Sequence, residues 1–505
     1  MHMNRSPYLS GFLLAPVLAW LLGFPRAPDQ RRGERDASVV ASAARPQQAA
    51  SGSPAQAPAF DLVIARGRVM DPASGLDRAP LWVGIRGDSI AALADTALAG
   101  RTVIDAAGQV VAPGFIDVLS YSPNAYGIWR KLEDGVTTNL AMHGASADMG
   151  AWYRSTGRSR WPINYGGAFS NPNARERLGI SRYRAATAAE LARLVDLAER
   201  AMKDGALGVA MSPEYTPGMT TDEVLAMARV AAAAHAPVFF HARYSDTIPP
   251  GTDAEGIHEV LETARRTGAA VHVDHIASAA TFDMAAALDS IARAIAAGLV
   301  VTACVYPYDY WATKLSQARF DAGWQQRFGI GYGALQIAGT TERLTAESFR
   351  RYRAQGKLAV AYAIPDTAVA LALRAPFVMI GSDAILNPGN NNHPRASGAF
   401  SRVLGVYVRE RGTISLMDAI RKMTLLPAQS LEARAPAMRR KGRLAVGADA
   451  DIVVFDPARV SDRATVEHPE LASVGISWVV VAGKVALDPK GPRYQVRAGR
   501  PVRAD

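Results

Sequence analysis

Short apolar runs alternate with helical patterns from residue 113 to residue 440 of the 505-residue chain. Eight of these runs have the length and composition of strands, and most are followed by a segment of helical periodicity. The runs end near Tyr121, His143, Ala168, Ser212, His241, His275, Tyr306 and Asp383. Because alternating strands and helices favour a parallel sheet, this α/β pattern predicts a (β/α)8 TIM-type barrel.

Two of the helical segments carry signals that mark their first turn. Thr187 followed by Glu190 forms a capping box at the start of a helix predicted over residues 187–203. Ser415 followed by Asp418 repeats this device at the start of residues 415–423. Both signals support the predicted alternation of strands and helices.

Further strand-like runs lie on both sides of the barrel region. Residues 60–65, 81–85 and 103–105 precede it, and residues 450–456 and 478–484 follow it. Gly and Pro residues separate the N-terminal runs. We therefore expect a small β-sandwich formed from both ends of the chain, by residues 58–112 and 441–505, with the barrel at 113–440 between them.

Residues 1–57 differ from the rest in composition. Arg5 precedes an apolar run over residues 11–24, which is typical of a secretory signal and short for a membrane span of about 20 residues. Residues 1–27 are therefore predicted to be a signal peptide or an N-terminal anchor, and residues 28–57 a disordered linker. We expect a protein exported to the periplasm or secreted, with anchoring to the membrane as the alternative.

The chain carries a net charge of +10, which raises the question of a nucleic-acid partner. The sequence contains no base-reading motif and no basic helix interleaved with aromatic residues, so we expect no nucleic acid. Its single cysteine, Cys304, excludes an intrachain disulfide. The sequence does not predict an oligomeric state.

Polar residues close several of the predicted strands. His241 and His275 end apolar runs one strand–helix unit apart. His143 ends the second run, and Asp383 ends the eighth. Because a (β/α)8 barrel carries its chemistry at the carboxyl ends of its strands, these side chains are expected at one mouth. Three imidazoles and a carboxylate there could hold one Zn2+ that activates a water molecule, with Asp383 taking up the proton.

Each of these residues also has a structural interpretation. A single strand-end histidine is more often a hydrogen-bonded structural residue, and Asp383 could merely cap the turn that follows its strand. The paired spacing of His241 and His275 favours a site, whereas His143 fits either interpretation. His272 alternates away from His275 along its strand and is expected to be structural.

Several motifs in consistent order resemble the N-acyl-D-amino-acid deacylase (D-aminoacylase) branch of the amidohydrolase superfamily. The resemblance covers residues 58–490. Its motifs lie at residues 113–117, 135–138, 205–208, 214–218, 241–243, 274–275, 306–308, 380–383, 393–395, 421–428 and 447–451.

The resemblance implies a metal-dependent hydrolase that cleaves the amide bond of an N-acyl D-amino acid or a related small N-acyl compound. By position, His241 and His275 match the ligands of the tightly held metal ion, and Asp383 matches the catalytic aspartate. The residues that fall on motifs of the substrate pocket are Tyr215, Tyr308, Arg395 and Arg243. The guanidinium of Arg395 could pair with a substrate carboxylate.

Three positions depart from the family pattern. The His-x-His that normally ends the first strand is Leu119-Ser120-Tyr121 here, so a second metal ion is not expected. Some N-acetylglucosamine-6-phosphate deacetylases of the superfamily also lack these histidines and work with one metal ion. The usual Asn-Cys-Gly after the second strand is Met142-His143-Gly144, and we hypothesise that His143 replaces the cysteine ligand. The lysine expected two residues after His275 is Ala277, which removes one anchor for a substrate carboxylate.

The sequence thus predicts an amidohydrolase with one Zn2+ held by His143, His241 and His275. Two alternatives stay open. One is a cyclic-amide hydrolase or deaminase, and the other is a non-catalytic barrel that acts as a binding protein. The acyl group, side chain and stereochemistry of the substrate are not predicted.

Overall fold

The computed structural model describes residues 59–249 and 251–504, and its centre is a sheet of eight parallel strands. Each strand pairs with the next one along the chain, so the sheet order follows the sequence. The strands are β6 (Phe115–Asp117), β7 (Val136–Ser146), β8 (Asn164–Ser170), β9 (Val209–Met211), β10 (Val238–Phe240), β11 (Val271–Val273), β12 (Val301–Val305) and β16 (Val378–Ile380). The predicted barrel is confirmed.

The two ends of this sheet, β6 and β16, are joined by residues that follow them. The amide of Asp383 donates to the carbonyl of Leu119 at 2.7 Å, and the amide of Ser382 donates to Oδ1 of Asp117 at 2.9 Å. The ammonium of Lys131 donates to Oδ2 of Asp117 at 2.7 Å and to the hydroxyl of Ser382 at 2.5 Å. Hydrogen bonds to Ser382 and Asp383, two of them from or to the buried pair of Lys131 and Asp117, therefore close the barrel where the strand ladder does not.

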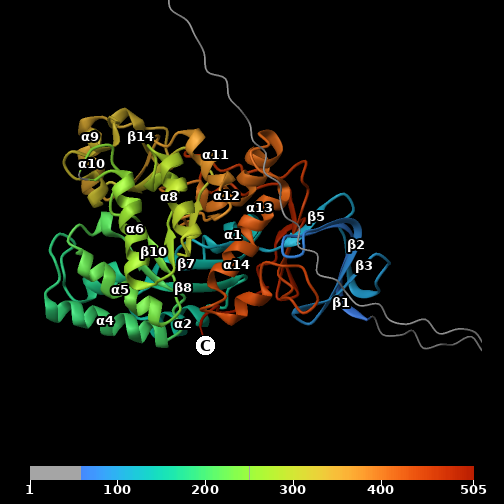
Figure 1. The fold of residues 1–505 in the computed structure, drawn as a ribbon. Helices are drawn as coiled ribbons and strands as arrows, with labels where there is room; N and C mark the ends of the chain where they lie inside the picture. The colour runs from blue at the N-terminus through green and yellow to red at the C-terminus, as the bar shows by residue number, and fades with distance from the viewer. Residues whose placement is uncertain (1–58, 250, 505) are drawn as a thin grey trace, which may run out of the picture. The chain divides into compact units, whose positions relative to one another are not determined.

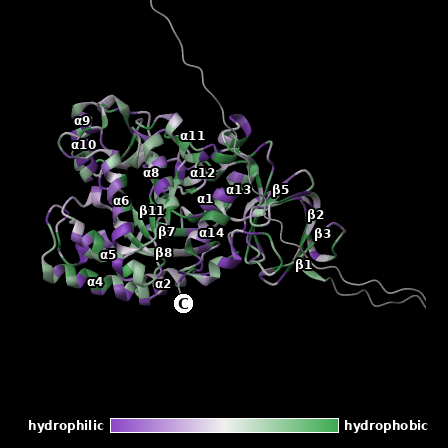
Figure 2. Ribbon diagram, viewed as in Figure 1, coloured by the Kyte–Doolittle hydropathy of each residue, from purple (hydrophilic) through white to green (hydrophobic). Residues whose placement is uncertain are grey.

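Helices cover the outside of the barrel, with polar residues toward solvent and apolar residues toward the strands (Figure 2). Both predicted helix starts are present: Oγ1 of Thr187 accepts from the amide of Glu190, and Oγ of Ser415 accepts from the amide of Asp418. The helices are α1 (Ile128–Glu133), α2 (Met149–Arg158), α3 (Asn171–Arg177), α4 (Ala188–Lys203), α5 (Thr221–Ala233), α6 (Asp253–Thr267), α7 (Ile276–Ala279), α8 (Met284–Ala296), α11 (Asp366–Arg374), α12 (Arg395–Arg402), α13 (Leu416–Met423) and α14 (Leu425–Leu431).

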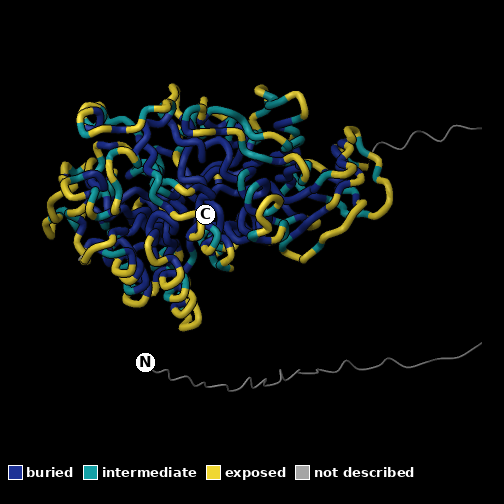
Figure 3. The backbone as a smooth tube through the Cα atoms, turned by 90° about the horizontal axis from the view of Figure 1, so that it is seen from above, coloured by how far each residue is buried: buried dark blue, intermediate teal, exposed yellow. Residues whose placement is uncertain are grey.

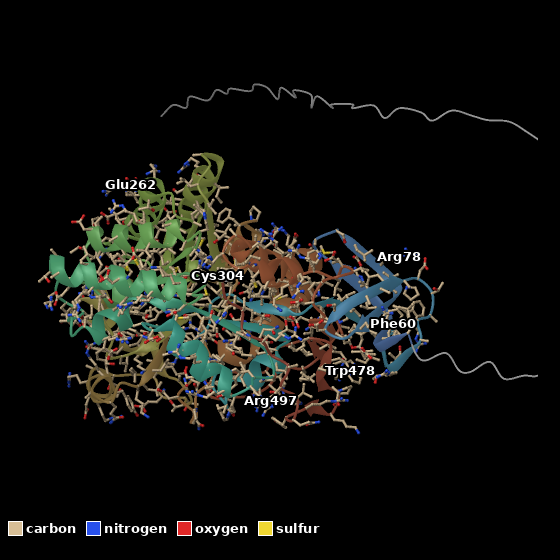
Figure 4. All side chains as sticks on the ribbon, turned by 90° about the horizontal axis from the view of Figure 1, so that it is seen from below. Phe60, Arg78, Glu262, Cys304, Trp478 and Arg497 are labelled. Carbon is tan, nitrogen blue, oxygen red and sulfur yellow. The ribbon has the colours of Figure 1, made fainter. Side chains whose placement is uncertain are left out.

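The barrel strands are buried on both faces, which explains their unbroken apolar runs (Figure 3). In β10, Val238 and Phe240 belong to the core shared with the helices. Phe239 points the other way, into a cluster inside the barrel with Met379 and Cys304. Figure 4 shows Cys304 among the central elements of the molecule. Because side chains alternate between the two faces of each strand, the barrel strands contribute both to the core shared with the helices and to the cluster inside the barrel.

A second, nine-stranded sheet combines both ends of the described chain, as predicted. Strand β5 pairs with β17, so the first and last thirds of the chain lie side by side (blue and red in Figure 1). The strands are β1 (Phe60–Asp71), β2 (Leu76–Arg86), β3 (Ser89–Ala94), β4 (Gly100–Asp105), β5 (Val110–Pro113), β17 (Ile452–Phe455), β18 (Ile476–Val481), β19 (Lys484–Asp488) and β20 (Gly491–Pro492). Its own core includes Leu62, Val83 and Ile452, whereas Val453 and Phe455 pack into the main core.

A small inserted sheet between β12 and β16 was not predicted. It consists of β13 (Trp311–Lys314), β14 (Leu335–Ile337) and β15 (Leu358–Ala361), paired antiparallel in the order β13-β15-β14. The helices α9 (Trp324–Phe328) and α10 (Ala346–Ala354) lie in the same insertion. Its strands have only three or four residues, too few to show a clear period of two in the sequence.

The predicted signal peptide or anchor at residues 1–27 and the predicted linker at 28–57 lie outside the described residues. Within the described part of the chain, none of the helices has the length and apolar character that crossing a membrane requires.

Candidate active site

Polar residues that end the barrel strands meet at the carboxyl end of the barrel. His143 lies in β7, His241 and His275 follow β10 and β11, and Asp383 follows β16. The ring centroids of His241 and His275 are 4.6 Å apart. The ring of His143 is 5.6 Å from that of His241 and 5.8 Å from that of His275. One nitrogen from each ring lies within 4.8 Å of the others, so the three imidazoles form a single cluster.

His241 and His275 point their ring nitrogens at each other. Nδ1 of His241 is 2.9 Å from Nε2 of His275. Burial lowers the pKa of His143 and holds the pKa of His275 well below its usual value. Both rings are therefore neutral near pH 7, which is the form that offers a lone pair to a metal ion.

Glu214 holds His241 from the opposite side, a role that the sequence analysis did not assign. It lies in the helical turn η1 (Pro213–Tyr215) after β9, with Oε2 at 2.6 Å from Nε2 of His241. Burial would raise the pKa of Glu214, but the charge of Arg319 and the hydrogen bond from His241 outweigh it and lower that pKa to about 2. Since an ionised carboxylate only accepts, Nε2 of His241 donates and its Nδ1 keeps the lone pair that faces His275.

These donors fit a zinc ion. Zinc–imidazole bonds of about 2.0–2.1 Å in tetrahedral geometry separate two ligand nitrogens by roughly 3.3–3.4 Å, near the 2.9 Å between His241 and His275. The carboxylate on the outer nitrogen of His241 is the partner that metal-binding histidines commonly have. Within residues 59–249 and 251–504, this is the one group of three metal-ligating side chains at such spacing.

Asp383 is held by two donors, one on each carboxylate oxygen. Nη2 of Arg395 donates to Oδ2 at 2.7 Å, and the hydroxyl of Tyr121 donates to Oδ1 at 3.1 Å. Oδ1 also lies 3.8 Å from Nε2 of His143. Burial would raise the pKa of Asp383, but the positive charge of Arg395 outweighs it and lowers that pKa. Asp383 is therefore an ionised carboxylate beside the histidine cluster, able to accept a proton.

The backbone is strained at two of the four strand-end residues. His275 has a φ of 32° and Asp383 a φ of 48°, in the left-handed region that residues other than glycine rarely adopt. Such a conformation costs about 1–3 kcal/mol and persists where the surrounding structure enforces it. The strain falls where β11 and β16 end and deliver these side chains to the mouth.

A cavity of about 830 Å³ opens over the cluster. His143, Tyr215, Asp383 and Arg395 line it, and Arg182 and Lys314 are exposed on its lining. The ring of Tyr215 lies 4.2 Å from that of His241. A cavity of this size accommodates a small organic molecule.

The model of the Amidohydrolase family matches residues 128–487 of this sequence. The chain belongs to the amidohydrolase family. This amidohydrolase is 34% identical over 491 residues to N-acyl-D-glutamate deacylase of Alcaligenes xylosoxydans xylosoxydans, covering 88% of this chain and 97% of the relative. It is 31% identical over 471 residues to the D-aminoacylase of the same organism, covering 84% of this chain and 94% of the relative.

A solved structure is similar over the same range. It is N-acyl-D-glutamate deacylase from Bordetella bronchiseptica in complex with zinc and a phosphonate inhibitor that mimics the tetrahedral intermediate. It matches with a TM-score of 0.76 and 29% identity, over 88% of this chain and 100% of the other. These relatives confirm the predicted D-aminoacylase branch and the predicted metal-dependent hydrolase that acts on carbon–nitrogen bonds other than peptide bonds.

Two residues stand in the amidohydrolase barrel where the family's first-strand histidines are expected. Leu119 is fully buried in the apolar cluster inside the barrel. Tyr121 extends to the cavity, where its ring stacks on His143 at 5.3 Å between centroids and its hydroxyl reaches Asp383. Neither residue supplies an imidazole, so the ligands for a second ion on this strand are missing.

Two of the predicted substrate-binding residues do not line the cavity. The guanidinium of Arg243 turns outward and donates to both carboxylate oxygens of Glu259 in α6 and to the carbonyl of Met219. Tyr308 is buried against Arg402 and the ring of His393. Tyr215 and Arg395 line the cavity, whereas Arg243 and Tyr308 lie in structural surroundings.

The position of the family's lysine, Ala277, is buried in α7. The guanidinium of Arg319 lies close to this position. Its Nη2 is 3.5 Å from the carbonyl oxygen of Ser278, the residue after Ala277. His272, expected to be structural, hydrogen-bonds through Nδ1 to the hydroxyl of Thr302 at 2.8 Å.

Proposed function

We propose that this amidohydrolase removes the acyl group from N-acyl D-amino acids with a single zinc ion held by His143, His241 and His275. The observation that carries the proposal is the cluster of three imidazoles beside an ionised aspartate, with His143 and Asp383 lining the cavity. A similar solved structure contains zinc and a phosphonate that mimics the tetrahedral intermediate, and a relative is named N-acyl-D-glutamate deacylase. Both support the same chemistry.

Each residue of the site has a separate task in this proposal. A zinc ion, when bound, supplies the Lewis acidity that activates water toward an amide carbonyl. Asp383 takes up the proton of the attacking water and returns it to the nitrogen of the leaving amine. Arg395 keeps Asp383 in place with one arm of its guanidinium. Its Nη1 is buried, has no hydrogen-bond partner among residues 59–249 and 251–504, and can donate to a substrate carboxylate.

The test combines metal analysis with a panel of substrates. We expect the purified protein to bind one equivalent of zinc and to lose it when His241 and His275 are both replaced by alanine. The zinc-loaded protein should hydrolyse N-acyl D-amino acids faster than their L isomers, hydantoins or amino-heterocycles. Binding well below one equivalent in the unmodified protein, or no turnover with zinc, cobalt or manganese, would contradict the proposal.

We also propose that the protein is exported through its N-terminal segment. The positive residue and apolar run of residues 1–27 support this proposal. Expression of the full chain should yield a protein in the periplasm or medium whose mass corresponds to loss of that segment. A full-length protein in the membrane fraction would favour the anchor instead, and one in the cytosol would contradict export.

A further inference from the structure

Arg319 reaches the histidine cluster from an insertion that is remote in sequence. It lies in the helical turn η2 (Ala318–Phe320), between the inserted strands β13 and β14. Its Nη1 donates to Oε2 of Glu214 at 2.6 Å, and the same oxygen lies 2.6 Å from Nε2 of His241. One carboxylate oxygen therefore joins the insertion to a proposed metal ligand.

The guanidinium of Arg319 is rigidly packed. Its side chain is 3% exposed. Its central carbon lies 4.2 Å from the ring centroid of Trp311 and 4.6 Å from that of Phe328. Arg327 donates to the backbone carbonyl of Arg319 at 2.7 Å. Aromatic faces on a planar cation fix its direction as well as its charge.

Every partner of the Glu214 carboxylate is a donor. Oε2 accepts from Arg319 and His241, and Oε1 accepts from the hydroxyl of Ser245 at 3.0 Å. Ser245 is itself 3.2 Å from Nη1 of Arg319. With its acceptor sites used in this way, Glu214 fixes both the rotation of the His241 ring and the nitrogen that carries the hydrogen.

We propose that Arg319 is a positioning residue that acts through Glu214 on His241 and so sets the affinity of the site for its metal ion. Arg319 holds the Glu214 carboxylate in place, and Glu214 aims Nδ1 of His241 at the ion. The inference rests on the proposed function, because it assumes that the three histidines bind a metal. Through Arg319, the insertion between β12 and β16 becomes part of the metal site.

The test measures zinc affinity directly. We expect Glu214→Gln and Arg319→Met to weaken zinc binding about 10- to 100-fold in competition with a chromophoric chelator, the range typical for partners of metal ligands. Arg319→Lys should restore most of the affinity, since an ammonium can still pair with Glu214. The visible spectrum of the cobalt-substituted protein should change with Glu214→Gln, because the orientation of His241 changes.

The matched control is Glu223→Gln. Glu223 pairs with Arg175, and their side chains are 1% and 2% exposed, but the pair contacts none of the three histidines. This variant should lose stability without a change in zinc dissociation constant or cobalt spectrum. Equal zinc dissociation constants for the unmodified protein, Glu214→Gln and Arg319→Met would overturn the inference alone. Failure of the unmodified protein to bind zinc would overturn the proposed function and this inference together.

Discussion

Asp383 shows how single residues define this site. Its two carboxylate oxygens are occupied by different donors, Arg395 and Tyr121, and its backbone is left-handed. These constraints leave the carboxylate little freedom to rotate away from the histidines. A base held in this way needs no rearrangement before it accepts a proton.

Replacing Asp383 by asparagine tests that role. The amide oxygen of asparagine can still accept from Arg395, and its amide nitrogen can donate to the hydroxyl oxygen of Tyr121, but the side chain cannot take up a proton. We expect Asp383→Asn to keep its zinc content and to lose about 10²- to 10⁴-fold in kcat, measured by release of the free amino acid.

A suitable control is Asp366→Asn. Asp366 pairs with Arg411 near the surface, where the two side chains are 49% and 42% exposed. This variant should keep full activity. Full activity in Asp383→Asn would remove Asp383 from the mechanism.

The sequence located the histidines and Asp383 because each closes an apolar run. It could not locate Glu214, whose partner Arg319 is 105 positions away, because that contact is created only by the fold. Arg243 was predicted to bind the substrate because it falls on a motif of the resemblance, at residues 241–243. The chain leaves the β10 strand at that point, and the long side chain of Arg243 finds Glu259 on α6 instead.

At the scale of elements, the junction between the first and last barrel strands, β6 and β16, depends on side-chain contacts. No ladder of backbone hydrogen bonds between β6 and β16 appears in the sheet order of the described residues. Lys131 and Asp117 form an ion pair beside this junction, with side chains 2% and 0% exposed. Both hydrogen-bond across it to the hydroxyl of Ser382, which follows β16. Removing one member would leave the other as a buried charge without its counter-charge.

We therefore expect Lys131→Met to lower the free energy of unfolding by about 3–5 kcal/mol, measured by urea unfolding followed through tryptophan fluorescence. Arg293→Met is the control, since Arg293 pairs with Asp289 on the surface, where the side chains are 68% and 61% exposed. That change should cost less than about 1 kcal/mol. Similar losses in the two variants would refute a special role for the junction.

The type and order of these elements followed from the sequence, because strand runs and capping residues are local signals. The inserted sheet did not, because its short strands carry no clear period and gain their stability from pairing with one another. The contacts that close the barrel could not be predicted from the sequence either, since Lys131 and Ser382 are 251 positions apart.

At the scale of the whole molecule, residues 499–504 return to the amino end of the barrel. Val502 is 1% exposed and belongs to the apolar cluster inside the barrel. Its amide donates to the carbonyl of Tyr165 at 2.7 Å, and its carbonyl accepts from the hydroxyl of Tyr153 at 2.9 Å. The C-terminal segment is thus a structural part of the barrel as well as a continuation of the sandwich.

This predicts that Val502→Asp destabilises the whole protein. An unpaired carboxylate in an apolar cluster should lower the free energy of unfolding by more than about 3 kcal/mol. Val446→Asp provides the matched control, because Val446 is 66% exposed and should tolerate the charge. Urea unfolding at neutral pH compares the two, and equal stabilities would show that the C-terminal segment contributes little.

The pairing of β5 with β17 has a consequence for biosynthesis. Val110 aligns with Phe455, so the N-terminal strands leave the ribosome long before their neighbour exists. Until translation is nearly complete, one edge of the early strands has no partner, and the polypeptide cannot reach its final structure. The nine-stranded sheet can therefore be completed only after residues 452–455 have been synthesised.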